Sequence, residues 1–314
     1  MKLGLGTAAL GRPQYINVRQ NNNIKHDLET FRKHSFQVLE DAYNSGIRYF
    51  DTAPGYGLAE GLVLEWLKTK NDKTIEIATK WGYTYTANFD TNATIHEVKE
   101  HSLAKLNEQW GYSKLLLPYL KVYQIHSATL ETGVLKNKEV LEQLAFLKKE
   151  HNLKIGITTT GTNQVEVLKK ALEILVDGEP IFDLFQVTYN FLDQSLKEML
   201  AELISQNKSI VVKEAMANGR IFRNERYPNY NEMYSILDNL SKKYNVGIDA
   251  ISLKYCEQTI TNSIVLSGAS NTKQLKENLK MNSFSLSIDD IEILNSFKTA
   301  PESYWIERKK LQWN

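Results

Sequence analysis

Four polar residues at or just after the ends of three consecutive predicted strands carry groups that could move a proton. Asp51 ends an apolar run at 47–51 and Tyr56 follows in the next turn, while Lys80 and His126 end runs at 75–80 and 122–126. Lysine beside tyrosine would stabilise the phenolate and lower the tyrosine pKa, and aspartate would hold the lysine charged and oriented. Histidine would orient a carbonyl or assist proton transfer. The set suits donation of a proton to a carbonyl oxygen while a hydride arrives from a cofactor.

Each of these residues also has an ordinary structural explanation when it is considered alone. An aspartate at a strand end is usually a cap, and a tyrosine in a turn usually packs. A lysine at a barrel rim can extend its amine to solvent, and a lone histidine is more often hydrogen-bonded than catalytic. In barrels, catalytic groups gather at the C-terminal ends of the strands. The hypothesis of a catalytic site therefore depends on the placement of all four residues together at the ends of consecutive strands.

Several other classes of protein are disfavoured. There is no G-x-S-x-G or H-E-x-x-H motif, and the single cysteine, Cys256, excludes an internal disulfide and any multi-cysteine metal site. We expect no bound metal, because the six histidines fall mostly in helices or loops. The 38 Lys and Arg balance 37 Asp and Glu, so no global field attracts nucleic acid or an anionic membrane. No apolar stretch approaches the ~20 residues of a membrane span, and the expected location is cytoplasmic.

The chain of 314 residues alternates short β-rich runs with longer helical patterns, without a Pro-, Gly- or Ser-rich linker. This order predicts one domain, 1–314, folded as an α/β (β/α)8 TIM barrel with an extra C-terminal helix at 287–297 and a tail at 298–314. An open doubly wound sheet is the alternative. The expected strands are 3–6, 47–51, 75–80, 122–126, 154–157, 184–188, 210–213 and 264–266. The expected helices are 31–44, 59–70, 94–109, 138–150, 164–176, 195–206, a segment between 234 and 258, and 272–281. Thr94 and Glu97 form a capping-box pattern at the third of these helices, and 12–29 is expected to be a solvated loop.

The segment 4–9 partly matches the glycine loop of dinucleotide-binding folds, with an alanine as its last small residue. No helical pattern follows, because Gly11, Arg12 and Pro13 intervene, and no acidic ribose ligand closes a βαβ unit within about 30 residues. We therefore interpret the segment as a glycine-rich exit from the first strand.

Taken together, the motifs resemble those of the aldo-keto reductase family. The resemblance rests on Asp51-Thr52-Ala53 with Tyr56-Gly57 and Glu60, on Ala78-Thr79-Lys80, on Tyr123-Gln124-Ile125-His126, and on segments 185–190 and 267–279. The matches run in order from about Leu3 to Leu279. The resemblance implies a barrel that binds NADP(H) or NAD(H) without a Rossmann domain. It also implies that Tyr56 is the general acid, that Lys80 and Asp51 tune it, and that His126 positions the carbonyl.

The resemblance also implies a set of cofactor-binding residues. Departures from the family pattern are Thr159 in place of the usual amide, Lys213 in place of an aromatic residue that stacks on nicotinamide, and Gly268 and Gln274 where NADPH-preferring relatives carry Lys and Arg. The expected cofactor is NADP(H), with NAD(H) as the alternative. The implied contacts are Gly6, Thr7, Ala8 and Asp51 near the nicotinamide ribose, Thr158 and Gln186 at its amide, Lys213, Met216, Asn218, Gly219 and Arg220 along the seventh strand and the pyrophosphate loop, and Gly268, Ser270, Gln274, Glu277 and Asn278 around the adenosine.

The expected partner is a small carbonyl compound or sugar, and neither the direction of reaction nor the oligomeric state follows from the sequence. Aromatic residues at 81–89 and in the tail could wall the substrate pocket or only cover the barrel. Two alternatives stay open at this point. One is a cofactor-binding redox sensor or regulatory subunit with little turnover, and the other is a metal-dependent barrel hydrolase.

Overall fold

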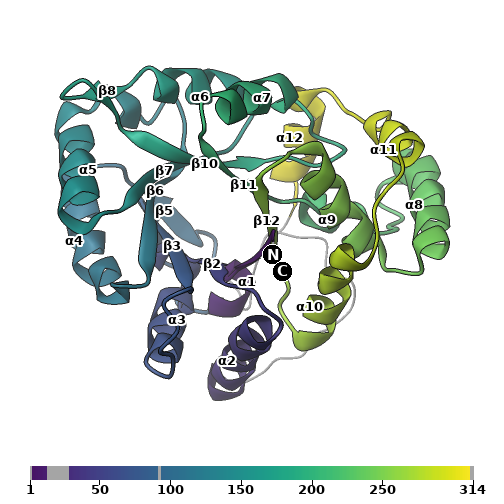
Figure 1. Cartoon of the computed structure of the whole chain (residues 1–314), viewed down its shortest axis with the longest axis horizontal. Coiled ribbons are helices and arrows are strands. Elements are labelled where there is room, and N and C mark those ends of the chain that lie inside the picture. Colours follow the sequence, from purple (N-terminus) through teal and green to yellow (C-terminus); the bar gives the residue numbers. More distant parts are fainter. Residues whose placement is uncertain (1, 13–27, 91–92, 312–314) are drawn as a thin grey trace.

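Eight parallel strands close into a barrel in the computed structural model, which describes residues 2–12, 28–90 and 93–311 (Figure 1). The strands pair in the order β1-β12-β11-β10-β7-β6-β3-β2. All eight predicted strands are confirmed, with ends that differ by a residue or two, and the open sheet is excluded. Their bounds are β1 Leu3–Gly6, β2 Tyr49–Asp51, β3 Glu76–Trp81, β6 Leu120–Ala128, β7 Lys154–Thr159, β10 Phe182–Thr188, β11 Ser209–Lys213 and β12 Ser263–Ser267.

Helices surround the barrel and cover the outer faces of its strands (Figure 1). The α-helices are α1 Ala8–Gly11, α2 Leu28–Asn44, α3 Ala59–Leu67, α4 Leu103–Ser113, α5 Lys138–His151, α6 Gln164–Leu172, α7 Lys197–Ser205, α8 Asn231–Tyr244, α9 Ile248–Thr259, α10 Thr272–Leu279, α11 Ile288–Asn295 and α12 Pro301–Lys309. Short 3₁₀ helices are η1 Pro54–Tyr56, η2 Lys114–Leu116, η3 Val134–Lys136, η4 Ala217–Gly219, η5 Pro228–Tyr230 and η6 Lys280–Ser283.

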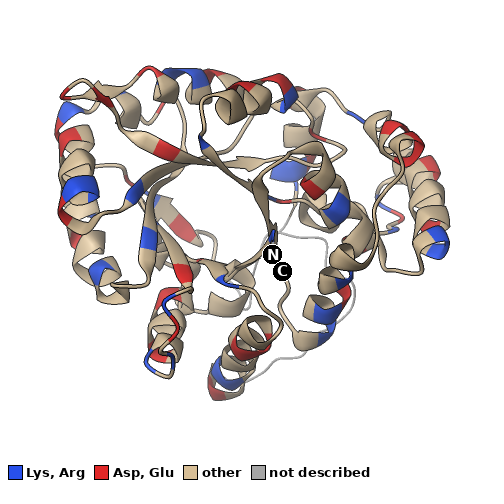
Figure 2. Cartoon of the chain, viewed as in Figure 1, with Lys and Arg blue, Asp and Glu red and all other residues tan. Residues whose placement is uncertain are grey.

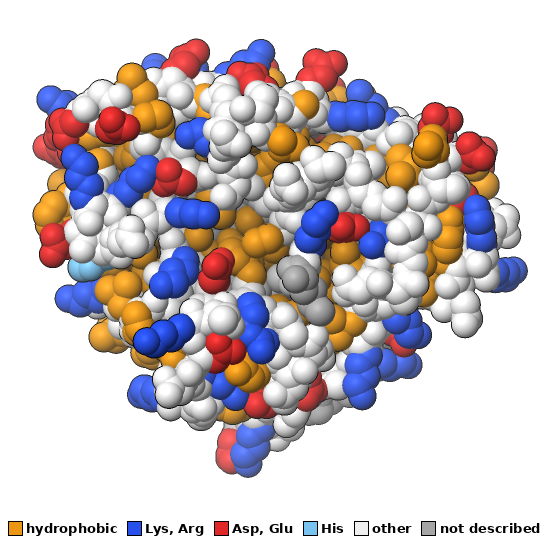
Figure 3. Space-filling view, in the orientation of Figure 1, with side chains coloured by type: hydrophobic (Ala, Val, Ile, Leu, Met, Phe, Trp, Pro, Cys, Tyr) orange, Lys and Arg blue, Asp and Glu red, His pale blue; other side chains and the backbone are white. Residues whose placement is uncertain are grey.

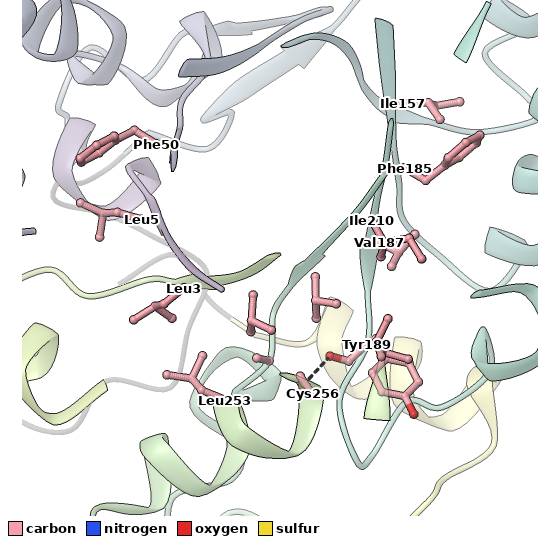
Figure 4. Packing of buried hydrophobic residues seen from close by; sticks show 14 of the residues in the cluster. Leu3, Leu5, Phe50, Ile157, Phe185, Val187, Tyr189, Ile210, Leu253 and Cys256 are labelled. Carbon is pink, nitrogen blue, oxygen red and sulfur yellow. Dashed lines mark hydrogen bonds between the residues drawn. The ribbon is translucent and has the colours of Figure 1, made fainter. Parts of the chain in front are cut away.

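Alternation along each strand divides its side chains between two cores, because successive side chains point to opposite faces. On β2, Tyr49 belongs to the cluster inside the barrel, whereas Phe50 belongs to the cluster between strands and helices and packs 4.8 Å from Trp66 of α3. Figure 4 shows part of this outer core, where the buried thiol of Cys256 donates to the carbonyl of Tyr189 at 3.4 Å.

The inside of the barrel is layered. An apolar layer is followed, two residues further along the strands, by polar residues that include Asp51 and Lys80. The N-terminal mouth is a cavity of about 420 Å³, seen in Figure 3 as a hollow with hydrophobic side chains in its floor and charged ones at its rim. The polar layer therefore lies toward the opposite, C-terminal mouth, where the functional residues were expected. The apolar layer consists of Tyr49, Ala78, Val122, Leu184, Val211 and Leu266.

The helix predicted for 94–109 is wrong in its first half. A hairpin of β4 (Tyr83–Tyr85) and β5 (Glu97–Lys99) occupies this region, and α4 begins only at Leu103. Ser102 is the N-cap, because its hydroxyl accepts a hydrogen bond from the backbone N–H of Lys105. Glu97 takes no part in a capping box, since its carboxylate pairs with Arg12.

Other bounds also differ from the prediction. The helix expected at 164–176 ends at Leu172, because Asp177 and Gly178, both with positive φ, turn the chain into a short hairpin of β8 (Leu175–Val176) and β9 (Glu179–Pro180). The segment between 234 and 258 forms two helices, α8 and α9, separated at Asn245, which is left-handed with φ of 53°. These turns depend on one or two residues with positive φ, which the periodicity of the sequence does not reveal.

The two ends of the chain also depart from expectation. One helical turn, α1, follows β1 directly, although no helix was predicted there. Arg12, assigned to a solvated loop, is 3% exposed, and the rest of that predicted loop up to residue 27 lies outside the described residues. The predicted helix at 287–297 is confirmed as α11, but the tail contains a further helix, α12, with Tyr304 and Trp305 buried.

Acidic and basic residues are interspersed along the outer helices, as the colouring of the ribbon in Figure 2 shows. No helix in the described part of the chain is long and apolar enough to cross a membrane.

Candidate active site

Asp51, the last residue of β2, is the centre of a buried hydrogen-bond network at the C-terminal mouth. Its Oδ1 accepts a short hydrogen bond from the Lys80 ammonium, and both side chains are at most 3% exposed. Its Oδ2 accepts from the amides of Gln186, at 2.7 Å, and Gln124, at 3.3 Å. Lys80 also donates to the carbonyl of Thr52 at 3.0 Å. Burial is tolerable here because the two charges are paired, the carboxylate accepts further hydrogen bonds and the ammonium donates another.

Tyr56 ends the 3₁₀ turn η1 and lies over this ion pair. Its hydroxyl oxygen is 3.4 Å from Nε2 of His126, and the Lys80 ammonium is 4.7 Å from the centre of its ring. The Tyr56 and His126 rings meet edge to face at 5.4 Å. Gly57, with φ of +64°, allows the sharp turn that follows. The structure thus brings together the four residues that were predicted to be catalytic.

The protonation states in this group follow from burial. Burial, with the charge of Asp51 adding to it, raises the pKa of Tyr56 well above 10.0, and Arg12 opposes this shift. The direction is opposite to the lowering expected from Lys80, because burial and the negative charge of Asp51 outweigh it. Burial, followed by the charge of Lys80, holds the pKa of His126 well below 6.5. Tyr56 is therefore a phenol that can donate its proton, and His126 is neutral.

Two further residues next to this group were not assigned a role from the sequence. Arg12 donates to the carbonyl of Gly55 at 3.1 Å and pairs with Glu97 at 2.9 Å, with its guanidinium 5.5 Å from the centre of the Tyr56 ring. Glu60 accepts hydrogen bonds from Thr79 and, at 2.9 Å, from Ser113, and burial raises the pKa of its carboxyl. Glu60 stood in the motif that carries the resemblance, whereas nothing in the local pattern distinguished Arg12.

The residues expected near the nicotinamide are tied to the catalytic group. Thr7, after β1, donates from its N–H and its hydroxyl to the carbonyl of Asp51, and Gly6 and Ala8 flank it. Gln186 donates to the Asp51 carboxylate. Thr158 on β7 accepts a hydrogen bond of 2.6 Å from the N–H of Ser127. The side chains of Thr7, Gln186 and Thr158 therefore form hydrogen bonds with candidate catalytic residues or with residues next to them.

The segment after β11 binds the C-terminal helix. Lys213 donates to the hydroxyl of Thr188 at 2.7 Å, and burial lowers its pKa to about 8 although Glu214 opposes the shift. Burial alone would raise the pKa of Glu214, but the charges of Arg308 on α12 and of Lys213 lower it to about 2. Arg220, fully buried, donates to the carbonyls of Ala217 and Tyr304 and pairs with Glu307.

The other predicted pyrophosphate residues, Met216, Asn218 and Gly219, form or flank the turn η4, in which Ala217, Asn218 and Gly219 all have positive φ. Arg220 anchors this turn to α12. Its guanidinium is 4.1 Å from the centre of the Tyr304 ring.

The residues expected around the adenosine lie after β12 and on α10. Gly268 is exposed, with nothing within 4 Å of the position that a Cβ would occupy. Gln274 accepts from the N–H and hydroxyl of Ser270 at 2.8 and 3.0 Å. The amide of Asn278 and the hydroxyl of Ser267 are 2.8 Å apart, and Glu277 pairs with Lys280. The open backbone at Gly268 and the polar groups beside it fit a nucleotide.

Within residues 2–12, 28–90 and 93–311, no group of three or more His, Cys, Asp or Glu residues is arranged to hold a metal ion.

The expected cofactor residues lie at or after the ends of five strands, β1, β7, β10, β11 and β12. The candidate catalytic residues lie on or just after β2, β3 and β6. All of them open onto one mouth of the barrel.

Comparison with known proteins gives consistent matches. A model of the aldo/keto reductase family matches residues 2–299. The NADH-specific methylglyoxal reductase of Escherichia coli is 24% identical over 96% of this chain and 95% of its own length. The L-galactose dehydrogenase of Arabidopsis thaliana is 25% identical over 77% of this chain and 76% of its own.

Solved structures share the fold. The holo form of an aldo-keto reductase from Bacillus halodurans has a TM-score of 0.69 at 24% identity, covering 95% of this chain and 92% of its own. A glycerol dehydrogenase from Gluconobacter oxydans has a TM-score of 0.72 at 17% identity, covering 94% and 90%.

Proposed function

The chain belongs to the aldo/keto reductase family, a family of NAD(P)(H)-dependent oxidoreductases that act on carbonyls, and we propose that Tyr56 is its proton donor. The single observation that carries this proposal is the position of the Tyr56 hydroxyl, 3.4 Å from Nε2 of a neutral His126 and above the buried Lys80–Asp51 pair. The substrate we propose is an aldehyde, a ketone or a sugar at its anomeric carbon.

In the proposed reaction, the nicotinamide cofactor supplies the hydride in reduction and receives it in oxidation. The neutral His126 orients the substrate oxygen toward Tyr56. The phenol of Tyr56 gives its proton to that oxygen as the carbonyl carbon is reduced. The Lys80 ammonium, 4.7 Å from the ring, stabilises the phenolate that remains, and Asp51 keeps the lysine charged and in place. In oxidation, the phenolate accepts the proton of the alcohol.

We propose NAD(H), rather than the NADP(H) expected from the sequence, as the preferred cofactor. The adenosine side lacks Lys and Arg at Gly268 and Gln274, and it carries two interacting carboxylates. With the Asn278 amide oriented so that its oxygen accepts from Ser267, its nitrogen donates to Asp249 Oδ2 at 2.6 Å. Burial raises the pKa of Asp249, and the charge of Glu277 adds to the shift. A 2′-phosphate would bring further negative charge to this place. The relative named as NADH-specific is in keeping with this preference.

The proposal is tested by titrating the purified protein with NADH and NADPH, following tryptophan fluorescence, and then adding a panel of aldehydes, ketones and sugars. We expect tighter binding of NADH and measurable cofactor oxidation with at least one carbonyl class. Cofactor binding with no turnover on the whole panel would instead favour the redox sensor. Binding of neither cofactor would refute the proposal.

A further inference from the structure

The residue after His126 has a backbone conformation that L-residues seldom adopt. Ser127 has φ of +51°, in the left-handed region, at the point where β6 and β7 lose register. This conformation is unfavourable for an L-residue and persists only where its surroundings fix it. The direction of the His126 side chain depends on this peptide, so whatever fixes the peptide also fixes the histidine.

Three side chains hold the peptide groups on either side of Ser127. Nε2 of His101 is 2.9 Å from the carbonyl oxygen of His126, and the Lys99 ammonium donates to the carbonyl of Ser127, also at 2.9 Å. The hydroxyl of Thr158 accepts from the N–H of Ser127 at 2.6 Å. Two of these three bonds come from residues 99–101, where the β4–β5 hairpin leads into α4.

The His126 ring has no hydrogen bond at Nδ1 within the described residues. In many sites a hydrogen bond at the second ring nitrogen fixes the orientation of a histidine. Here the ring is held by packing, against Tyr83 of β4 at 4.6 Å and against Tyr56 at 5.4 Å. The hairpin therefore contacts both the ring and the backbone of His126.

His101 fits this position closely. A carbonyl only accepts, so Nε2 of His101 carries the proton in this bond, and burial lowers the pKa of His101 to about 4, which keeps the ring neutral. Its ring packs on Trp81 at 5.4 Å. Gly82, with φ of +106°, leaves the space, since a Cβ there would lie 2.2 Å from the His101 ring.

We propose that His101, assisted by Lys99, is a positioning residue that holds the His126 backbone so that Nε2 of His126 faces the Tyr56 hydroxyl. This inference rests on the proposed function, because it assigns His101 a role through His126. The insertion between β3 and α4 thereby serves the reaction as well as covering the barrel. Small displacements of a reacting group can cost on the order of 100-fold in rate.

The test compares His101→Phe, which keeps a ring against Trp81 but removes the donor, with His101→Gln, whose amide can donate from nearly the same place. We expect kcat to fall roughly 10- to 100-fold in His101→Phe, with the Kd for NADH unchanged. We expect His101→Gln to recover most of that loss. The ¹⁵N chemical shift of Nε2 in His126 should move in the first variant and return in the second. The matched control is His151→Phe, which replaces a half-buried histidine that packs on Trp110 at 5.0 Å. His151 ends α5 just before β7, at the N-terminal end of the barrel opposite the candidate site, and its replacement should leave kcat unchanged.

A folded His101→Phe variant with wild-type kcat, or a His101→Gln variant no better than it, would overturn the proposal. If His101→Phe does not fold, Lys99→Met takes its place, with Lys99→Arg as the conservative variant and the same two outcomes. The variant His126→Phe distinguishes the proposed catalytic role of His126 from the proposed positioning role of His101. Unchanged kcat in His126→Phe would refute the role of His126 in the proposed function, whereas an impaired His126→Phe with an unaffected His101→Phe would refute the positioning role alone.

Discussion

The polar residues on two sides of the same barrel mouth differ in their burial and in their hydrogen-bond partners. On the side of β2, β3 and β6, the functional groups bond one another. Asp51 and Lys80 form an ion pair and are at most 3% exposed. Tyr56 and His126, which contact each other beside this pair, are half-buried. On the side of β12 and α10, the residues expected to contact the cofactor are mostly exposed or half-buried, and they bond neighbours with no chemical role, as Gln274 does with Ser270.

This difference separates the residues proposed to carry out the chemistry from the residues expected to bind the cofactor. The groups of the buried side hold one another through several coupled hydrogen bonds, so a single change there should be severe. The exposed side contributes through individual contacts with solvent-screened charges. A single change there should alter affinity moderately and leave the chemistry in place.

The largest effect expected from the buried side is that of Lys80→Met. The substitution removes the cation that stabilises the Tyr56 phenolate and leaves the Asp51 carboxylate with amide donors only, so we expect kcat to fall by about 100- to 1,000-fold. Steady-state kinetics and an NADH titration measure the loss and show whether the cofactor still binds. Lys149→Met, at an exposed lysine of α5, is the matched control. Activity within twofold of wild type would mean that the buried side is not the catalytic one.

A second prediction concerns α12, the helix that pairs with the segment after β11. Arg308→Met leaves the carboxylate of Glu214 buried without its arginine, and we expect the free energy of unfolding at pH 7 to fall by about 3 kcal/mol. The pKa of Glu214 is lowered from 4.5 to about 2, so the contribution is fully present above pH 4.5 and is lost as the pH falls toward 2.

Urea unfolding at pH 7 and at pH 3 measures this effect, and the difference between variant and wild type should be smaller at pH 3. The control is Arg223→Met, in an exposed pair with Asp238, where we expect a loss under about 1 kcal/mol. Equal losses in the two variants would show that the α12 contact is an ordinary surface pair.

The smallest effect is expected on the exposed side, from Gln274→Arg. A cation at this position would attract a 2′-phosphate, so we expect the ratio of the Kd values for NADPH and NADH to shift about 10-fold toward NADPH. Gln206→Arg, after α7, makes the same substitution elsewhere and should leave the ratio unchanged. A large loss of kcat in Gln274→Arg would contradict the separation between the two sides.

The sequence predicted the strands well because each strand is an apolar run bounded by clear turn residues. It failed at 94–109, where Thr94 and Ser102 both offer an N-cap and only Ser102 is used. It also missed α12, whose anchors Glu214, Arg220 and Asn190 are distant in the chain. Contacts of this kind leave no periodic signal.

The candidate catalytic residues could be found from the sequence because each one ends a strand or directly follows one, and strand ends converge. Arg12 and His101 could not be found in this way. Their contacts depend on where a loop and a hairpin fold back. Arg12 lies in a segment with no distinctive pattern, and His101 lies in one whose pattern predicted a helix. The direction of the shift in the Tyr56 pKa was also missed, because burial and the charge of Asp51 outweigh the neighbouring lysine.

The most direct test of the central claim is Tyr56→Phe, which removes one hydroxyl and leaves the ring in place. We expect kcat for carbonyl reduction to fall at least 100-fold while the Kd for NADH stays within twofold of wild type, because only the proton donor is lost. Tyr112→Phe, at a tyrosine that is 73% exposed, is the matched control and should keep full activity. Turnover by Tyr56→Phe close to that of wild type would contradict the account.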